Sequence, residues 1–413
     1  MVKIPEHETT SLSGGQPRSM RLAYVTTYDV SDISRWTKTD YKLGNWGAGY
    51  HLAKSLENQS ISLDYIGISD ETNEYFITKF KRKFYSRLSK KVYATWAEPS
   101  VIRDYASQIS IKLSNYRSDI VLGIENQSIL PLAYLRCNQP SVIWTDTSLA
   151  GLIDFYFSPF NNFCDETKRN IYAMEKAGLD RCKLVIFSSD WAAQTAIKTY
   201  GFEPSKIRVV PWGANLECNR TDEDIKSIVE SKATTPCKLL FIGVDWFRKG
   251  GDTAVELAKE LNKMGLNTEL LVVGHQPVTT EPLPSFIKSI GFVNKYTEEG
   301  VNKLNKLFCE SHFLIMPSRA ESYGHVFCEA NSFGLPCLAT NVGGIPTIIK
   351  EGLNGKTFSL KANISEYCTY IASLMANYSE YKKLAHSSFN EYQSRLNWAV
   401  AGQAAKKLIM ELV

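Results

Sequence analysis

Short apolar runs recur along this chain, and each run is continuous rather than alternating between apolar and polar positions. Continuous apolar strands are typical of parallel sheets that helices cover on both faces. Helical stretches such as 50–57 and 191–200 separate the runs, so the pattern predicts a doubly wound α/β sheet. The first set of predicted strands covers residues 22–26, 63–68, 120–123, 142–144, 184–187 and 207–210.

A second set of strands follows a polar segment at residues 216–235. The helix after its first strand carries apolar residues at i, i+3, i+4 and i+7, and we expect it to begin near Thr253, with Glu256 completing a capping box. Two Rossmann-like halves suit 413 residues, because that length exceeds one ordinary core. The strands of this second set cover residues 239–243, 270–274, 313–316 and 337–340.

Composition narrows the function classes. No apolar run reaches the roughly 18 residues of a membrane span, and the polar N-terminus has no apolar signal-peptide core, so we expect a cytoplasmic protein. Nine singly spaced cysteines predict free thiols. The six histidines lack metal-ligand spacing and no Asp-x-Asp lies near a strand end, so we expect neither a metal nor a cofactor. A net charge of +4 does not indicate nucleic acid, and the absence of G-x-G-x-x-G counts against a dinucleotide oxidoreductase.

Two glutamates eight residues apart form the most informative local pattern. Glu321 follows strand 313–316, and Glu329 is expected about two turns into a short helix that Gly334 and Pro336 end. Eight helical residues rise roughly 12 Å, about the length of a sugar diphosphate plus a ribose. One carboxylate would then hold a ribose diol and the other the sugar, with helix N–H groups facing a pyrophosphate. A solvated helix face is the alternative interpretation.

The flanking residues favour the first interpretation. Segment 317–336, followed by Gly343-Gly344, resembles the Glu-x7-Glu motif of retaining GT-B glycosyltransferases, above all family 4, and the resemblance runs from about residue 20 to the C-terminus. It implies the GT-B fold, with two Rossmann-like domains facing across a cleft. The implied parts are a disordered tail (1–19), an N-terminal acceptor domain (20–213), a C-terminal nucleotide-sugar donor domain (214–390) and a helix that crosses back (391–413).

The resemblance also implies an activity: metal-independent, retaining transfer of a hexose from a nucleotide diphosphate sugar to a hydroxyl of a glycan, lipid or small molecule. Glu329 would bind the ribose hydroxyls, and Glu321 would hold sugar hydroxyls and favour positive charge at the anomeric carbon. Arg248 and Lys249 would stabilise the leaving diphosphate, where negative charge develops. Family members often have an arginine where this chain has Val244, so Arg248 is expected to replace it.

In the first half, segment 45–50 occupies the place of the family's glycine-rich loop, so Gly47 and Gly49 are expected near the donor phosphates. A plain helix start is the alternative. Asp146 is expected to orient a sugar hydroxyl, although Thr145 stands where many relatives have histidine. The other expected donor contacts lie at strand ends and inside the motif: Gly243, Gly274, Phe292, Val293, Ser322, Tyr323, Gly324 and His325. For His325 the alternative is an ordinary helix residue with no role in the site.

Two further readings stay open from the sequence. The departures at Val244 and Thr145 allow a catalytically inactive sugar-nucleotide-binding protein. Another GT-B enzyme, such as a nucleotide-sugar epimerase or a glucan synthase, is a further alternative.

Segment 79–91 interleaves seven basic residues with apolar ones at near-helical spacing. It is interpreted either as an amphipathic helix with a solvated basic face or as a peripheral contact with the anionic inner face of a membrane.

Overall fold

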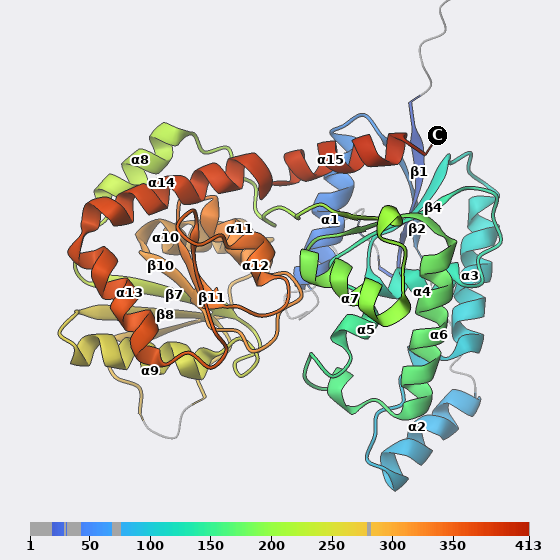
Figure 1. Cartoon of the computed structure of the whole chain (residues 1–413), viewed down its shortest axis with the longest axis horizontal. Helices are drawn as coiled ribbons and strands as arrows, with labels where there is room; N and C mark the ends of the chain where they lie inside the picture. The colour runs from blue at the N-terminus through green and yellow to red at the C-terminus, as the bar shows by residue number, and fades with distance from the viewer. Residues whose placement is uncertain (1–18, 29, 31–42, 68–75, 279–281, 413) are drawn as a thin grey trace, which may run out of the picture.

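The computed structural model describes residues 19–28, 30, 43–67, 76–278 and 282–412 (Figure 1). They form two α/β domains, each built on a six-stranded sheet. Apart from residue 19, the predicted tail lies outside the described residues, and so does most of the insertion at 29–43. Among the described residues, no helix combines the length and the apolar character needed to cross a membrane.

The N-terminal sheet has the order β2-β1-β3-β4-β5-β6, and every neighbouring pair is parallel. Along β1, Leu22 and Tyr24 pack into one apolar cluster while Ala23 and Val25 pack into another, so both faces are covered. The strands are β1 (Arg21–Thr26), β2 (Ser62–Gly67), β3 (Ile120–Gly123), β4 (Ser141–Thr145), β5 (Cys182–Phe187) and β6 (Ile207–Val209). The helices are α1 (Leu43–Glu57), α2 (Phe76–Leu88), α3 (Pro99–Leu113), α4 (Ile129–Leu132), α5 (Leu149–Leu152), α6 (Asp165–Arg181) and α7 (Asp190–Tyr200).

The C-terminal sheet has the order β12-β11-β10-β7-β8-β9. Read from β9, this is the Rossmann order, in which the first and fourth strands of the domain are neighbours at the point where the order reverses. The strands are β7 (Cys237–Gly243), β8 (Thr268–Gly274), β9 (Ile287–Gly291), β10 (Phe313–Met316), β11 (Cys337–Thr340) and β12 (Gly355–Phe358). The helices are α8 (Asp222–Ser231), α9 (Gly251–Lys263), α10 (Glu298–Glu310), α11 (His325–Asn331), α12 (Ile345–Ile348), α13 (Ile364–Ala376) and α14 (Tyr378–Arg395).

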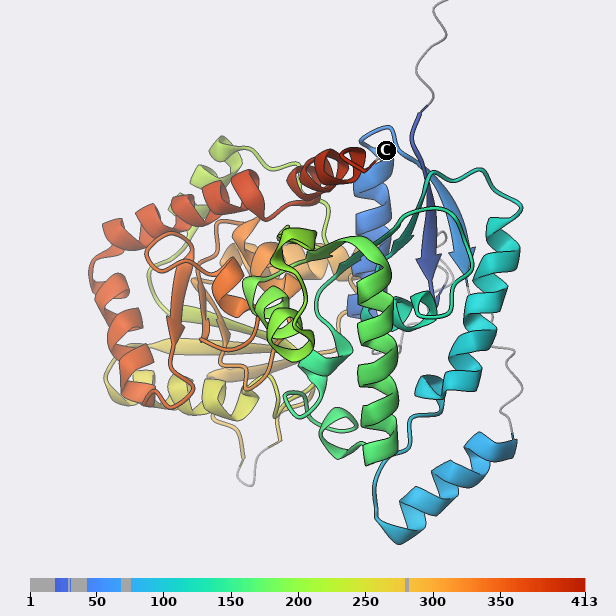
Figure 2. The ribbon, with the colours of Figure 1, turned by 45° about the vertical axis from the view of Figure 1, so that its right-hand side comes forward.

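The chain crosses between the domains twice. The first crossing lies between β6 and α8 and contains the predicted boundary at residues 213–214. The second follows α14, after which α15 (Trp398–Met410) packs against α1 of the N-terminal domain (Figure 2). The Lys406 ammonium donates to the Gln59 carbonyl at 2.7 Å. The expected crossing helix is therefore present, and it begins at Trp398 rather than at residue 391.

All ten predicted strands are present, but β9 and β12 were missed, since their edge positions leave several residues exposed or half-buried and their apolar content is low. Two expected helix starts are wrong. Helix α9 begins at Gly251, so Thr253 lies inside the helix and makes no capping box. Helix α1 begins at Leu43, so Gly47 and Gly49 belong to its first turns rather than to a loop before it.

Candidate active site

The carboxyl ends of β7 and β10 meet where the strand order of the C-terminal sheet reverses. Open α/β sheets bind ligands outside the strand ends at this position. Lys249 follows β7 and Glu321 follows β10, so the fold brings together two residues that the sequence leaves 72 positions apart. The predicted catalytic residues therefore lie where a ligand is expected.

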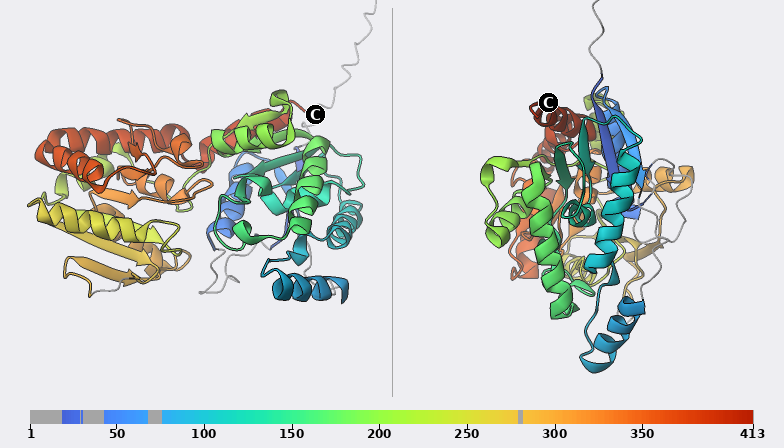
Figure 3. Two further views of the ribbon diagram at one scale, coloured as in Figure 1. Left: turned by 60° about the horizontal axis from the view of Figure 1, so that its bottom comes forward. Right: turned by 90° about the vertical axis from the view of Figure 1, so that its right-hand side faces the viewer.

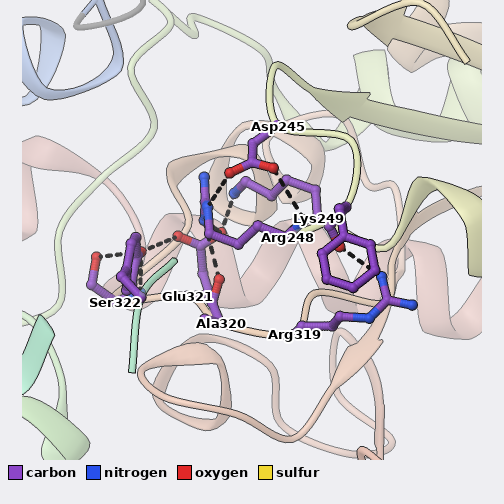
Figure 4. A network of polar contacts seen from close by, with 9 residues as sticks. Asp245, Arg248, Lys249, Arg319, Ala320, Glu321 and Ser322 are labelled. Carbon is purple, nitrogen blue, oxygen red and sulfur yellow. Dashed lines mark hydrogen bonds and ion pairs between the residues drawn. The ribbon is translucent and has the colours of Figure 1, made fainter. Parts of the chain in front are cut away.

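Glu321 is buried among cations (Figure 4). Its Oε2 atom pairs with the Lys249 ammonium, and Nη1 of Arg248 lies 3.7 Å from the same oxygen. Burial opposes the ionisation of Glu321, but Lys249 and Arg248 outweigh burial and lower its pKa below the ordinary value. Glu321 is thus an ionised carboxylate. Arg248 contacts it although the arginine stands four residues after Val244, the position at which family members often carry it.

Side-chain and backbone contacts fix the loop that carries Glu321. The Arg319 guanidinium makes two hydrogen bonds to the carboxylate of Asp252 on α9, at 2.8 and 2.7 Å. Gly344 N–H donates to the Glu321 carbonyl at 3.1 Å. Gly343 has φ +53°, and a Cβ there would lie 1.9 Å from the same carbonyl oxygen. The glycine pair of the motif therefore lets the chain pass directly over the backbone of Glu321.

Residues of the N-terminal domain complete this network. The Ser322 hydroxyl donates to Oδ2 of Asp146 at 2.7 Å, so Asp146 lies beside the motif. Ser322 N–H donates to the Tyr156 hydroxyl at 2.8 Å, and that hydroxyl donates to Oε1 of Glu321 at 3.3 Å. Burial raises the pKa of Asp146. Thr145 is buried, and its hydroxyl donates to the Thr147 carbonyl at 3.3 Å.

Tyr156 was missed by the sequence analysis. It lies beyond α5 in a run of three aromatic residues, 155–157, and no motif marks it. The guanidinium of Arg248 lies 4.9 Å from the centre of its ring. The neighbouring Phe157 contacts Phe247 of the other domain edge-to-face at 5.5 Å. The run of aromatic residues after α5 was the available signal, but sequence alone does not show which ring reaches Glu321.

Glu329 is also buried, and it pairs with Lys295, a second residue that sequence reasoning missed. The Lys295 ammonium lies 2.6 Å from Oε1 of Glu329. Burial alone lowers the pKa of Lys295, but Glu329 outweighs it and the pKa is raised. The expected 12 Å helical rise between the two glutamates is wrong, because α11 begins only at His325 and Glu321 lies in the preceding loop.

The two glycines of α1 lie in different surroundings. A Cβ on Gly47 would lie 1.8 Å from the hydroxyl oxygen of Tyr296, next to Lys295, so Gly47 allows α1 to approach the C-terminal domain. A Cβ on Gly49 would instead lie 2.6 Å from the hydroxyl oxygen of Tyr28, inside the N-terminal domain. Only Gly47 therefore lies on the side of α1 that faces the cleft.

The remaining predicted donor contacts divide into two groups. Gly243 lies against the Lys249 side chain and pairs with Gly274, while Phe292 is exposed and Val293 half-buried just after β9. Tyr323 and His325, which flank Gly324, point to the interdomain crossing instead. The Tyr323 hydroxyl donates to the Trp212 carbonyl at 2.6 Å. His325 Nδ1 donates to the Gly213 carbonyl at 3.0 Å.

Comparison with known proteins agrees with this architecture. Residues 222–390 match the family model described as glycosyl transferases group 1. An uncharacterized 41.2 kDa protein of the cps region of Klebsiella pneumoniae is 27% identical over 54% of this chain and 66% of its own length. D-inositol 3-phosphate glycosyltransferase of Acidothermus cellulolyticus is 26% identical over 41% of each chain. The chain thus spans less than two thirds of the length of these relatives.

Solved structures match over almost the whole chain. Sucrose-phosphate synthase from Thermosynechococcus elongatus aligns with a TM-score of 0.68 at 15% identity, covering 95% of this chain and 99% of that one. Anabaena Alr3699/HepE, in complex with UDP and glucose, aligns at 0.60 and 13%, covering 95% and 100%. The chain has the GT-B fold. Together the comparisons support a group 1 glycosyltransferase.

An open pocket of about 740 Å³ adjoins the charged network in this GT-B structure. Residues 244–248 line it together with Asp252, His275 and Val278. Arg248 therefore lies between the pocket and Glu321. Among the described residues, no group of three or more His, Cys, Asp or Glu side chains has an arrangement that could hold a metal ion.

Proposed function

We propose that this protein is a retaining, metal-independent glycosyltransferase that moves a hexose from a nucleotide diphosphate sugar to an acceptor hydroxyl. The observation that carries the proposal is the ionised Glu321, buried between Lys249 and Arg248 at the switch point of the donor-side sheet. The group 1 match over residues 222–390 and the UDP-bound structure of the same fold support a nucleotide-sugar donor.

In this mechanism the donor diphosphate lies against Lys249 and Arg248. Both cations stabilise the negative charge that develops as the bond between the anomeric carbon and the phosphate oxygen breaks. Glu321 holds sugar hydroxyls and favours the positive charge at the anomeric carbon. The acceptor oxygen bonds to that carbon on the face that the phosphate leaves, and its proton passes to the departing phosphate oxygen. The anomeric configuration is therefore retained.

Glu329 is proposed to accept hydrogen bonds from the ribose hydroxyls of the donor. The ion pair with Lys295 orients its carboxylate and gives the buried group a partner of opposite charge. Because Lys295 adjoins Tyr296, which meets Gly47 of the other domain, this end of the site is held by both domains. Closure of the domains then excludes water from the reacting bond.

Tyr156 is proposed to position the motif from the acceptor side. Its hydroxyl contacts both the carboxylate of Glu321 and the N–H of Ser322, which fixes the orientation of the carboxylate. This role replaces part of what a histidine at position 145 provides in many relatives. Tyr156 acts through Glu321 and is therefore a positioning residue.

Replacing Tyr156 by Phe should lower kcat about tenfold or more, the usual effect of losing a hydrogen bond to a charged group, while the affinity for free nucleoside diphosphate is unchanged. Steady-state transfer and nucleotide binding measure the two quantities separately. Tyr172→Phe is the matched control, because this tyrosine lies on α6 against Tyr200 and does not contact the motif. Wild-type kcat in Tyr156→Phe would contradict the positioning role.

Val244 and Thr145 stand where many family members have arginine and histidine. These two departures favour a second candidate, a GT-B protein that binds sugar nucleotides without catalysis. The structure weakens that argument at one of the two positions, since Arg248 reaches Glu321 despite Val244. An epimerase or glucan synthase would share the same donor site and would differ in its products. A cytoplasmic location belongs to this proposal as well.

The deciding experiment measures nucleoside diphosphate release from a panel of UDP-, GDP- and ADP-sugars by the purified protein in EDTA. Release from one donor is expected, by slow hydrolysis when no acceptor is present. Release only after Mg²⁺ or Mn²⁺ is restored would overturn metal independence. Tight donor binding without release, with or without candidate acceptors, would favour the inactive binder, and absence of binding would overturn the donor site.

A further inference from the structure

Helix α2 lies at the end of the N-terminal domain opposite α15 (Figures 1 to 3). One face of the helix is fixed to the domain. Thr78 is buried, the Tyr85 hydroxyl donates to Glu166 at 2.9 Å, and the Tyr85 ring stacks on Tyr93 at 5.7 Å. Lys81 donates to the same glutamate at 2.7 Å. The orientation of α2 about its own axis is therefore set by packing.

Another face of α2 is apolar and exposed. Phe76, Phe80, Phe84 and Leu88 follow one another at intervals of four positions, which places them in a row along one side of the helix. The rings of Phe80 and Phe84 stack at 6.3 Å within this row. A helix in a water-soluble domain normally turns such a face to the core, whereas here the core-facing side is polar. The exposed fractions are 87% for Phe76, 52% for Ile77, 61% for Phe80, 46% for Phe84 and 71% for Leu88.

A row of exposed basic residues runs beside the apolar row. Lys79, Lys83 and Arg87 also repeat every four positions, and 3.6 residues per turn place each of them next to the apolar row. Lys90 and Lys91, just after the helix, are exposed as well. The helix itself contains no acidic residue. The outward surface thus combines an apolar row with a row of positive charge.

We propose that this outward face of α2 docks on an anionic membrane surface. The apolar row enters the boundary between headgroups and acyl chains, and the basic row lies on the lipid phosphates. A second copy of the chain fits less well, because a two-fold contact through this face would bring like charges together. The inference is independent of the proposed transferase activity, since no residue of this face belongs to the candidate active site and its test needs no turnover.

The test is co-sedimentation of the full-length protein with vesicles of phosphatidylcholine, with or without phosphatidylglycerol. We expect at least tenfold more binding to the anionic vesicles, falling as salt rises. The paired substitutions Phe80→Glu with Leu88→Glu, and Lys83→Glu with Arg87→Glu, should each remove most of it. Ile111→Glu is the matched control, because Ile111 is 65% exposed on α3 of the same domain. All these positions are exposed, and thermal unfolding checks that each variant folds.

Several results would overturn the proposal. They are absence of vesicle binding by the wild type, equal binding to neutral and anionic vesicles, and wild-type binding by both double variants. Self-association of the wild type that the double variants lose would assign the face to a contact between copies instead. Nucleoside diphosphate release in solution should be the same in wild type and variants, so failure of membrane binding and failure of the proposed activity are separate results.

Discussion

Replacing Glu321 by Gln should lower kcat by about 10²- to 10³-fold, the usual loss when one electrostatic group of a transition state is removed. Affinity for free nucleoside diphosphate should stay the same or increase. The reason is the ion pairing: Glu321 competes with a diphosphate for Lys249 and Arg248, and the neutral amide does not. The predicted signature is loss of rate without loss of nucleotide binding.

Turnover with the donor identified from the panel and calorimetric titration with its nucleoside diphosphate measure the two effects. Glu310→Gln is the control, because Glu310 forms a more exposed ion pair with Lys238 on the same domain. Thermal unfolding is followed in parallel, since removing one partner of a buried ion pair destabilises a protein by about 3–5 kcal/mol. A folded Glu321→Gln protein with wild-type turnover would disprove the assigned role.

Replacing Lys249 by Met should lower kcat/KM by about 10²- to 10³-fold and, unlike the change at Glu321, should weaken nucleoside diphosphate binding. The ammonium is a point charge for a phosphate oxygen, and Met fills similar space without charge. The change also removes a cation that lowers the pKa of Glu321. With only Arg248 left to oppose burial, the pKa of Glu321 rises relative to the wild type, so activity should be lost at a higher pH as the solution is acidified.

The pH–rate profile of the Lys249→Met protein therefore tests the charge state of Glu321 as well as the role of Lys249. Lys259→Met is the matched control, because Lys259 lies on α9 in a surface ion pair with Glu256. Wild-type turnover in the Lys249→Met protein, with no shift of the acidic side of its pH–rate profile, would contradict the role of Lys249. Arg248 alone would then stabilise the leaving diphosphate.

Most of the fold could be predicted because parallel strands covered on both faces leave continuous apolar runs. The strands before Lys249, Asp146 and Glu321 belong to this kind, and parallel topology brings their carboxyl ends together across the cleft. The strands β9 and β12 could not be found, since their sequences, Ile-Lys-Ser-Ile-Gly and Gly-Lys-Thr-Phe, contain few apolar residues. Helix starts that depend on glycine conformation could not be predicted from composition either. An example is α9, which begins directly after Gly250.

The missed site residues have a common cause. Tyr156 and Lys295 matter because of the glutamates they contact, and those contacts join positions 165 and 34 residues apart. Nothing in the local sequence specifies such a pairing. Conversely, Tyr323 and His325 lie within the recognisable motif, yet their side chains point to the interdomain crossing. A motif thus fixes the path of the backbone more reliably than the direction of each side chain.

The two interdomain crossings touch each other, which limits how the domains can move. A Cβ on Gly213 of the first crossing would lie 2.4 Å from the backbone nitrogen of Trp398 in the second, and the rings of Trp212 and Trp398 lie 5.9 Å apart. Because the two connections pack against each other, we expect any relative motion of the domains to hinge at this contact. His325 stacks on both tryptophans and begins the helix that carries Glu329. A hinge motion at this contact would therefore also move the residue that begins the helix of Glu329, the proposed ribose ligand.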